Sequence, residues 1–276
     1  MQYHDTIRVG CKLLDLCSPV VMGILNVTPD SFYAGSRQQT DDAIARRAEE
    51  IVEQGGVVID VGACSTRPGG EQPSAEEEMS RLRQGLSVVR RVCPDAILSV
   101  DTYRPEVAKM SIEEFGPAII NDVTGGTGRD EDGVAGIFRV AAALRVPYVL
   151  TSVQPSMREM LLTFARDVAQ LHALGVADVI LDPGFGFGKT LDQNYEVLSH
   201  MSQLQVLGLP VLAGVSRKSM IYRALGITPD EALNGTTALH MTALLQGAAI
   251  LRVHDVREAV ECCRLWKMIK ESGVSE

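Results

Sequence analysis

The sequence has little of what marks secreted, membrane-spanning or nucleic-acid-binding proteins. Its six cysteines include no C-x-x-C pair, so we expect reduced thiols in a cytoplasmic protein. No apolar run is long enough to cross a bilayer, and no basic segment followed by an apolar stretch opens the chain, so we expect no membrane contact. The formal net charge of −9 argues against nonspecific binding to nucleic acid, and we expect no such partner, although local cations could still bind an anionic small molecule.

Linkers and metal-binding histidine pairs are missing as well. No Pro/Ser-rich stretch, low-complexity run or long charge block interrupts the 276 residues, which indicates a single domain over residues 1–276. No two of His4, His172, His200 and His240 have the spacing of a zinc site. Aromatic residues make up only 5% of the chain, which suits a core of small branched side chains.

What the sequence does have is a repeat of short apolar segments, each followed by polar or glycine-rich residues. Successive segments are about 32 residues apart, the length of one strand, one helix and two loops. Such a repeat predicts a (β/α)8 TIM barrel with its active site at the carboxyl ends of the strands. An open flavodoxin-like sheet is the competing fold, but it would need fewer units. The segments are VMGILN, VVIDVG, ILSV, AII, YVL, VIL, VLAG and AAIL.

Helix-start signals lie between these segments. We expect Thr40 to cap one helix, Ser74 and Glu77 to form a capping box at the next, and Pro105 to occupy the first turn of a third. Asp255 is placed to open the last helix. The chain therefore alternates strands and helices, as the barrel requires.

Two carboxylates at strand ends are the strongest candidate binding groups. Asp101 and Asp182 each follow an apolar segment, where a carboxylate is costly unless it meets a hydrogen-bond donor. Each could instead cap the following helix. With Asn121 between them in strand order, however, they form a donor and acceptor set that suits a flat heterocycle with an N–H edge.

A second group of residues suits an anion. Arg67 lies in a loop with hydroxyl groups and glycines, and Asn26 ends the first barrel strand, where it could hold a metal-bound phosphate. The segment 216–219 (Ser-Arg-Lys-Ser) places two cations where a helix begins, after the seventh strand. Arg252 and His254 follow the eighth strand at period-two spacing and therefore point the same way.

The segment GFGFGKT at 184–190 is not a P-loop, because Pro183 stands where that pattern needs its first glycine. It also differs from G-x-G-x-x-G, because Lys189 occupies the last glycine position. We interpret it as a flexible loop that offers Phe187 to an aromatic ligand and Lys189 to a charge.

Seven motifs, in their order and spacing, resemble the dihydropteroate synthase family over nearly the whole chain. They are MGILNVTPDSF, STRPGG, SVDT, IIND, LDPGFGFGK, SRKSM and RVHDV. The resemblance implies a (β/α)8 barrel of folate biosynthesis that joins 6-hydroxymethyl-7,8-dihydropterin diphosphate to p-aminobenzoate and releases diphosphate. It also implies Mg²⁺ as cofactor and, because dimers are common in the family, a homodimer.

The resemblance also implies roles for individual residues. The pterin would be bound by Asp101, Asn121, Asp182 and Lys218. The diphosphate would be bound by Asn26, Arg67, Arg252 and His254, with Asn26 also at the Mg²⁺. The p-aminobenzoate site would be shaped by Thr66, Pro68, Phe187, Lys218 and Ser219. The catalytic group would consist of Asp101, Asp182, Lys218, Arg252 and His254.

Chemically, diphosphate loss before amine attack is expected, because an electron-rich dihydropterin can delocalise the resulting cation. No Ser, Cys or His nucleophile is then needed. We also expect loops 28–35 and 64–70 to be mobile in the empty protein, so that p-aminobenzoate binds well only after diphosphate has ordered them.

The chain departs from the family pattern in three places, namely at Ala34, at Cys64 and over residues 151–155 (Thr-Ser-Val-Gln-Pro). Two alternatives therefore stay open. A methyltetrahydrofolate:corrinoid methyltransferase would keep the Asp/Asn/Asp set but would not need the anion-binding groups. A non-catalytic pterin-binding paralogue is made possible by the altered fifth strand end.

Overall fold

The protein is described by a computed structural model that covers residues 6–27, 37–64 and 72–272. Its centre is a closed barrel of parallel strands in the order β10, β3, β4, β5, β6, β7, β8, β9. These strands are β3 (Val20–Asn26), β4 (Val58–Gly62), β5 (Ile97–Asp101), β6 (Ile119–Asp122), β7 (Tyr148–Thr151), β8 (Val179–Asp182), β9 (Val211–Ala213) and β10 (Ala248–Val253). Each apolar segment identified in the sequence contributes one of them, so the barrel prediction is confirmed and the open-sheet alternative is wrong.

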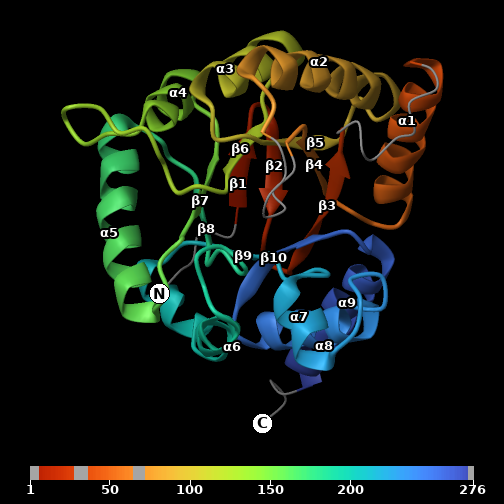
Figure 1. Cartoon of the computed structure of the whole chain (residues 1–276), viewed down its shortest axis with the longest axis vertical. Coiled ribbons are helices and arrows are strands. Elements are labelled where there is room, and N and C mark those ends of the chain that lie inside the picture. Colours follow the sequence, from red (N-terminus) through yellow and green to blue (C-terminus); the bar gives the residue numbers. More distant parts are fainter. Residues whose placement is uncertain (1–5, 28–36, 65–71, 273–276) are drawn as a thin grey trace.

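Helices surround the barrel in a ring (Figure 1). They are α1 (Arg37–Glu53), α2 (Ala75–Val92), α3 (Pro105–Phe115), α4 (Gly136–Leu144), α5 (Met157–Leu174), α6 (Leu191–Ser199), the 3-10 helix η2 (Met201–Leu207), α7 (Ser219–Leu225), α8 (Leu233–Leu245) and α9 (Val256–Ser272). Among the described helices, none combines the length and the apolarity needed to cross a membrane. Pro105 begins α3, and Ser74 caps α2 by accepting a hydrogen bond from the Glu77 amide, as predicted. The predicted start at Thr40 is wrong, because α1 already begins at Arg37.

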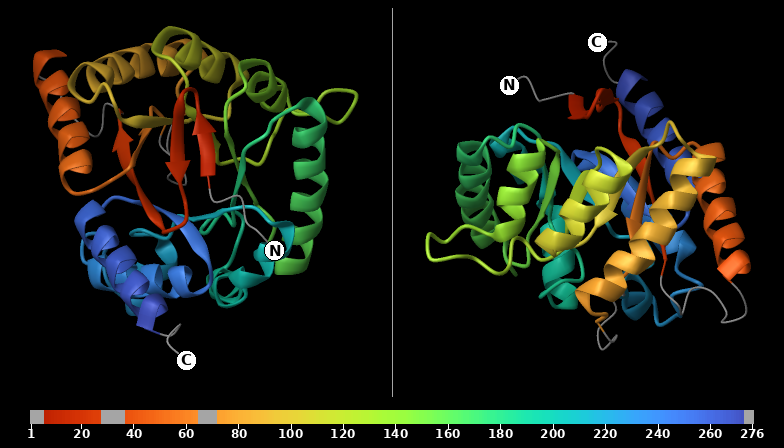
Figure 2. Two further views of the ribbon diagram at one scale, coloured as in Figure 1. Left: turned by 180° about the vertical axis from the view of Figure 1, so that it is seen from behind. Right: turned by 90° about the horizontal axis from the view of Figure 1, so that it is seen from above.

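The N-terminal segment forms a hairpin that the sequence reading did not predict. Strands β1 (Thr6–Val9) and β2 (Lys12–Asp15) pair antiparallel. Ile7 and Leu14 are each 1% exposed and belong to one apolar cluster with residues from the first halves of the barrel strands. The hairpin therefore closes the end of the barrel from which the strands start, as Figure 2 shows from the side.

The inside of the barrel is layered, because side chains alternate between its inner and outer faces along each strand. The layer next to the hairpin is apolar and consists of Met22, Val58, Ile97, Ile119, Val149, Ile180, Leu212 and Ile250. Two residues further along six of these strands, the inward positions become polar, at Asp60, Ser99, Asn121, Thr151, Asp182 and Arg252, whereas the same step on β3 and β9 gives Ile24 and Gly214. This change places polar groups at the carboxyl end of the barrel, which we call the mouth, above an apolar floor.

One polar side chain is buried away from the mouth. His240 of α8 is 1% exposed, and neither of its ring nitrogens has a hydrogen-bond partner within the described part of the chain. Burial lowers the pKa of His240 to about 4, with a small opposing effect from Asp255. The neutral imidazole is therefore a cost to the fold, since a buried polar group without partners loses its hydration.

We predict that His240→Leu stabilises the protein increasingly as the pH falls. Between pH 6.5 and pH 4 the unfolded state binds a proton on His240 that the folded state does not, so the native protein loses stability as the pH drops. The variant should remove a slope of up to about 1.4 kcal/mol per pH unit. Urea unfolding at several pH values measures this slope. His172→Gln, at an exposed position of α5, is the control. Equal slopes in wild type and His240→Leu would contradict the prediction.

Candidate active site

The mouth of the barrel is organised around one guanidinium. Arg252, on β10, donates from Nε to Asp60 Oδ2 at 2.5 Å and from Nη2 to Asp101 Oδ2. The Arg252 side chain is 11% exposed, and the two carboxylates are 0% and 9% exposed. Burial lowers the pKa of Arg252, but the charges of Asp60 and Asp101 more than offset this effect, so the guanidinium remains charged. Three strands that are far apart in sequence are thereby tied together inside the barrel.

Asn121 extends this cluster by one strand. Its Nδ2 donates to Asp60 Oδ2 at 3.0 Å, while its buried Oδ1 accepts no hydrogen bond from a described residue. The side-chain oxygen of Asn121 is therefore available to a donor on a ligand. Gly62 makes room for the group beside it, because a Cβ at Gly62 would lie 3.2 Å from the Asp101 Cβ.

Asp182 lies at the end of β8 and is 3% exposed. One of its oxygens accepts from the Gly184 amide at 2.7 Å, which shapes the turn after the strand. The alternative that Asp101 and Asp182 cap the next helices is wrong, because Arg104 and Thr190 occupy the cap positions of α3 and α6. Both carboxylates instead point into the barrel.

Lys218 brings an ammonium group to the same place. Its Nζ lies 3.7 Å from where a Cβ on Gly214 would be, so the ammonium group lies beside the residue that follows β9. It donates to the Phe185 carbonyl and lies 4.7 Å from the centre of the Phe187 ring. Burial lowers the pKa of Lys218 to about 8, against the opposing charge of Asp182. Ser219 follows as the first residue of α7.

The structure corrects part of the predicted anion site. Arg217 does not face the mouth: its guanidinium pairs with both oxygens of Asp255 at 2.8 Å and with carbonyls at Pro229 and Asp230. It fixes the loop before α7 to the start of α9. Lys218 is thus the cation that segment 216–219 contributes to the mouth.

His254 lies just past the end of β10, two residues after Arg252. It is exposed, its Nδ1 lies 3.2 Å from Ser216 Oγ, and its backbone amide donates to the same oxygen at 3.1 Å. Surrounding protein lowers the pKa of His254, and the positive charge of Arg252 lowers it further. A neutral ring that becomes protonated only when an anion approaches is therefore the expected state at neutral pH.

Asn26 ends β3, where it pairs with Gly62, and is exposed at the mouth. No cluster of three or more acidic, His or Cys side chains suited to a metal occurs in the described ranges. Asp60 and Asp101 are already engaged by Arg252, so the donor set fits a Mg²⁺ carried by phosphate oxygens and touched by one neutral amide. Residues Thr66, Arg67 and Pro68 lie outside the described residues, as do the predicted mobile loop 28–35 and, apart from Cys64, the predicted mobile loop 64–70.

One further correction concerns the loop after β8. Lys189 was expected to face a charge, but its ammonium donates to three backbone carbonyls instead. Phe185 is fully buried, which leaves Phe187 as the half-buried aromatic ring of that loop. The altered segment after β7 begins with Thr151 and Ser152, which are both 2% exposed.

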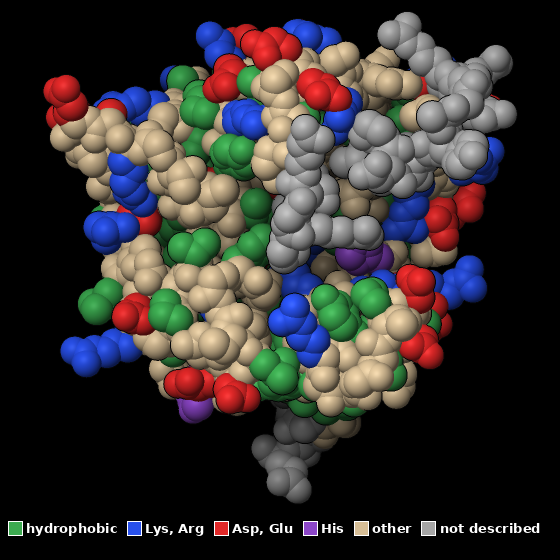
Figure 3. Space-filling model, in the orientation of Figure 1, with side chains coloured by type: hydrophobic (Ala, Val, Ile, Leu, Met, Phe, Trp, Pro, Cys, Tyr) green, Lys and Arg blue, Asp and Glu red, His purple; other side chains and the backbone are tan. Residues whose placement is uncertain are grey.

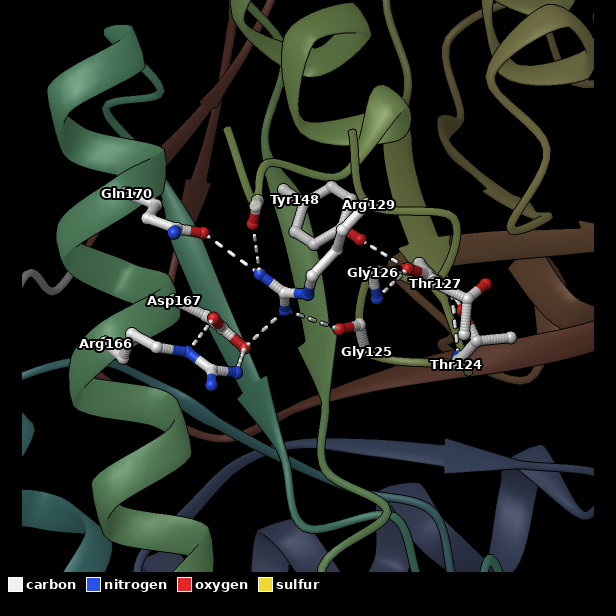
Figure 4. A network of polar contacts seen from close by, with 11 residues as sticks. Thr124, Gly125, Gly126, Thr127, Arg129, Tyr148, Arg166, Asp167 and Gln170 are labelled. Atoms are coloured by element: carbon white, nitrogen blue, oxygen red, sulfur yellow. Dashed lines mark hydrogen bonds and ion pairs between the residues drawn. The ribbon is translucent and has the colours of Figure 1, made fainter. Parts of the chain in front are cut away.

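A polar network on the outer face of the barrel holds the loop after β6. The Asp122 carboxylate accepts from Tyr148 Oη at 2.5 Å, from the Gly126 amide at 2.7 Å, and from the amide and hydroxyl of Thr124. Arg129 then bonds Asp167 and Gln170 on α5, so that loop and helix are joined (Figure 4). Asp122 points outward while its neighbour Asn121 points inward, so this network fixes the strand end that presents Asn121.

Asp60 is the site residue that sequence reasoning missed. It lies inside the VVIDVG segment, whereas the binding residues predicted from the sequence lie at or just after the ends of the apolar segments. The available signal was the alternation of Val58, Asp60 and Gly62, which places a carboxylate on the inner face.

We predict that Asp101 makes the native protein less stable as the pH rises from about 4 to about 7. Burial raises the pKa of Asp101 to about 7, with Arg252 opposing and Asp60 adding to the rise. In this window the folded state binds a proton that the unfolded state has lost, so stability falls with pH by up to about 1.4 kcal/mol per unit. Asp101→Asn should remove this slope in urea unfolding, whereas Asp132→Asn, whose side chain is 84% exposed, should not. An unchanged slope in Asp101→Asn would refute the prediction.

Comparisons with known proteins agree with this geometry. The family model described as "Pterin binding enzyme" matches residues 22–254. The dihydropteroate synthase of Escherichia coli is 38% identical over 91% of this chain and 92% of its own. A solved Xanthomonas albilineans dihydropteroate synthase with 4-aminobenzoic acid superposes with a TM-score of 0.87 at 34% identity, covering 96% of this chain and 98% of that one. A Yersinia pestis dihydropteroate synthase in a sulfonamide drug complex gives a TM-score of 0.84 at 34% identity, with 96% and 99% covered. The chain therefore belongs to the dihydropteroate synthase family of pterin-binding enzymes.

Proposed function

We propose that the mouth of this barrel performs the family reaction, the condensation of 6-hydroxymethyl-7,8-dihydropterin diphosphate with p-aminobenzoate to 7,8-dihydropteroate and diphosphate. The observation that carries the proposal is the polar layer above an apolar floor. Asp101, Asn121 and Asp182 lie there on inward positions of three strands, with Lys218 and Arg252 beside them. Three acceptors and two cations around one point suit a heterocycle joined to an anion.

The pterin fits the deeper part of this layer. Asp182 and the side-chain oxygen of Asn121 can accept hydrogen bonds from ring and amino N–H groups, and Lys218 can donate to a ring carbonyl. Binding would take the place of the bond from Lys218 to the Phe185 carbonyl. The buried carboxylates then lie close to the ring on which positive charge develops, so they would stabilise a pterin cation.

The diphosphate fits the outer part, where Asn26 and His254 are exposed at the ends of β3 and β10. Arg252 lies between the two parts and contributes its charge to both. Arg67 would complete this end on the grounds of the family motif. Mg²⁺, if it arrives on the phosphate oxygens, would supply neutralisation of the departing diphosphate.

The reaction needs positioned groups rather than a nucleophile. When the bond between the methylene carbon and the diphosphate oxygen breaks, its electron pair leaves with the diphosphate, and the amine nitrogen then bonds to the carbon and loses a proton. Cys64, the thiol nearest to the mouth, has a pKa raised to about 12 by burial and by Glu78, so it is not a nucleophile. We place diphosphate loss before amine attack because the electron-rich dihydropterin can delocalise the positive charge that this loss leaves.

The arylamine would lie against Phe187 and Lys218, with Ser219 at its carboxylate end. By the family motif, Thr66 and Pro68 would also shape this site. A sulfonamide has an arylamine at one end and a polar group at the other, so it would occupy the same place. A corrinoid methyltransferase is the weaker candidate, because it has no need for the cations and the histidine that border the outer part.

A homodimer is proposed on different grounds. Helix α9 buries one face against the barrel, yet Leu265, Met268 and Ile269 form a second apolar stripe and are 55%, 67% and 54% exposed. Leu245 on the adjacent α8 is 65% exposed. On the face shown in Figure 3, acidic and basic side chains are interspersed around the rim. A stripe at i, i+3 and i+4 on a helix suits burial against a second copy.

The buried thiols of Cys93, Cys262 and Cys263 suit the reducing cytoplasm.

We expect the purified chain to form dihydropteroate only when both substrates and Mg²⁺ are present. Asp182→Asn should bind the pterin at least about tenfold more weakly, because an amide donor replaces a carboxylate acceptor. Asp132→Asn, on the surface, should match wild type. Diphosphate release and the calorimetric affinity for pterin are the readouts. A sulfonamide should compete with p-aminobenzoate and not with the pterin. A folded wild type that binds pterin without forming product would instead be a non-catalytic paralogue.

For the dimer, we expect light scattering after gel filtration to give twice the chain mass of 29.8 kDa. Met268→Glu should yield monomers, because a charge would be buried without a partner. Leu162→Glu, at a 66% exposed position of α5, should remain dimeric. A monomeric wild type, or a dimeric Met268→Glu, would refute this interface.

A further inference from the structure

Lys189 joins two loops at the mouth through main-chain atoms alone. Its Nζ donates to the carbonyl of Ser152 at 3.0 Å, of Gly184 at 3.1 Å and of Phe187 at 3.2 Å. The first carbonyl belongs to the loop after β7 and the other two to the loop after β8. An ammonium has three donors, so these bonds use all of them. We call Lys189 and these three carbonyl groups the Lys189 clamp.

The two loops approach so closely that glycine is required between them. A Cβ at Gly184 would lie 2.1 Å from the Ser152 oxygen, and one at Gly188 would lie 2.8 Å from the Val153 oxygen. Both glycines also have positive φ, at 68° and 62°. The contact therefore brings carbonyl oxygens from both loops close together in a half-buried place. Partial negative charges repel one another there unless a cation lies between them.

The Lys189 clamp fixes the residue that faces the arylamine. Phe187 contributes one of the three carbonyls, so its backbone cannot turn without breaking the clamp. On the other side, the Gly186 amide donates to Asn194 Oδ1 at 2.7 Å. Between these two attachments the Phe187 ring is held 4.7 Å from the Lys218 ammonium.

We propose that Lys189 is a positioning residue that sets Phe187 for p-aminobenzoate, and that it does so through the main chain of the altered segment after β7. This inference rests on the proposed function. The clamp takes from this segment only the Ser152 carbonyl, a main-chain group that every residue type supplies. The departure of this segment from the family pattern therefore leaves the arylamine wall intact.

Lys189→Met tests the clamp, because it keeps the apolar stem and removes the ammonium. We expect the KM for p-aminobenzoate to rise at least about tenfold, the size of one lost charged hydrogen bond. The affinity for pterin diphosphate should change less than about threefold, since Asp101, Asn121 and Asp182 are untouched. Lys109→Met is the matched control, because that side chain is 60% exposed on α3. Equal effects on both substrates, or none, would overturn the proposal.

A double-mutant cycle with Phe187→Ala separates positioning from general stability. If Lys189 acts through Phe187, the double variant should bind p-aminobenzoate no more weakly than Phe187→Ala alone. Additive losses would mean that Lys189 acts elsewhere. Tm values of all variants show whether the fold is retained, and amide exchange at Gly186 and Phe187 should speed up in Lys189→Met but not in Lys109→Met.

Calorimetry can measure the binding of p-aminobenzoate in the presence of pterin and diphosphate, without any reaction. This measurement therefore tests the Lys189 clamp separately from the proposed reaction. Weaker binding by Lys189→Met, together with an inactive wild type, would support the clamp and refute the proposed reaction. An active wild type with unchanged binding in Lys189→Met would retain the reaction and overturn the clamp.

Discussion

Burying several carboxylates inside one barrel is possible only because Arg252 lies among them. An isolated carboxylate in a low-dielectric interior would become protonated or destabilise the fold. Here one guanidinium is shared by Asp60 and Asp101, and Asp60 in turn holds the Asn121 amide. Residues of β4, β5, β6 and β10 are thus fixed by a single cation. Removing one member of such a group leaves another unpaired, so the set acts as a unit rather than as separate contacts.

Other charged side chains around the mouth are also paired with groups of the protein itself. Arg217 is engaged by Asp255, Lys189 by carbonyl groups, and Asp122 by Tyr148 and the loop after β6. These side chains shape the loops, while a smaller set (Asp182, Asn121, Lys218 and His254) keeps polar atoms directed at the mouth. Lys218 and Arg252 therefore offer positive charge to an anionic substrate at the mouth, although the chain as a whole has a net charge of −9.

Much of this could be predicted from the sequence, because a parallel barrel converts strand ends into neighbours. Asp101, Asn121, Asp182 and Arg252 each end or follow an apolar segment, and the repeat alone brings them to one edge. Asp60 was missed because it lies inside a strand, where only the alternation of inward positions reveals it. The roles of Arg217 and Lys189 were misjudged because a sequence shows a charge but not its partner. The hairpin of β1 and β2 was missed because it is short and lies outside the repeat.

The hairpin also determines which end of the barrel is open to ligands. With Ile7 and Leu14 sealing one end of the barrel, the polar mouth is the end that the described residues leave to ligands. The apolar floor sets how deep a ligand can descend, and the heterocycle-binding groups lie directly above it. A ligand that must reach the floor has to enter ahead of one that stays near the doorway. If the heterocycle binds directly above the floor, as proposed, it would enter before the arylamine, and the joined product would leave arylamine end first.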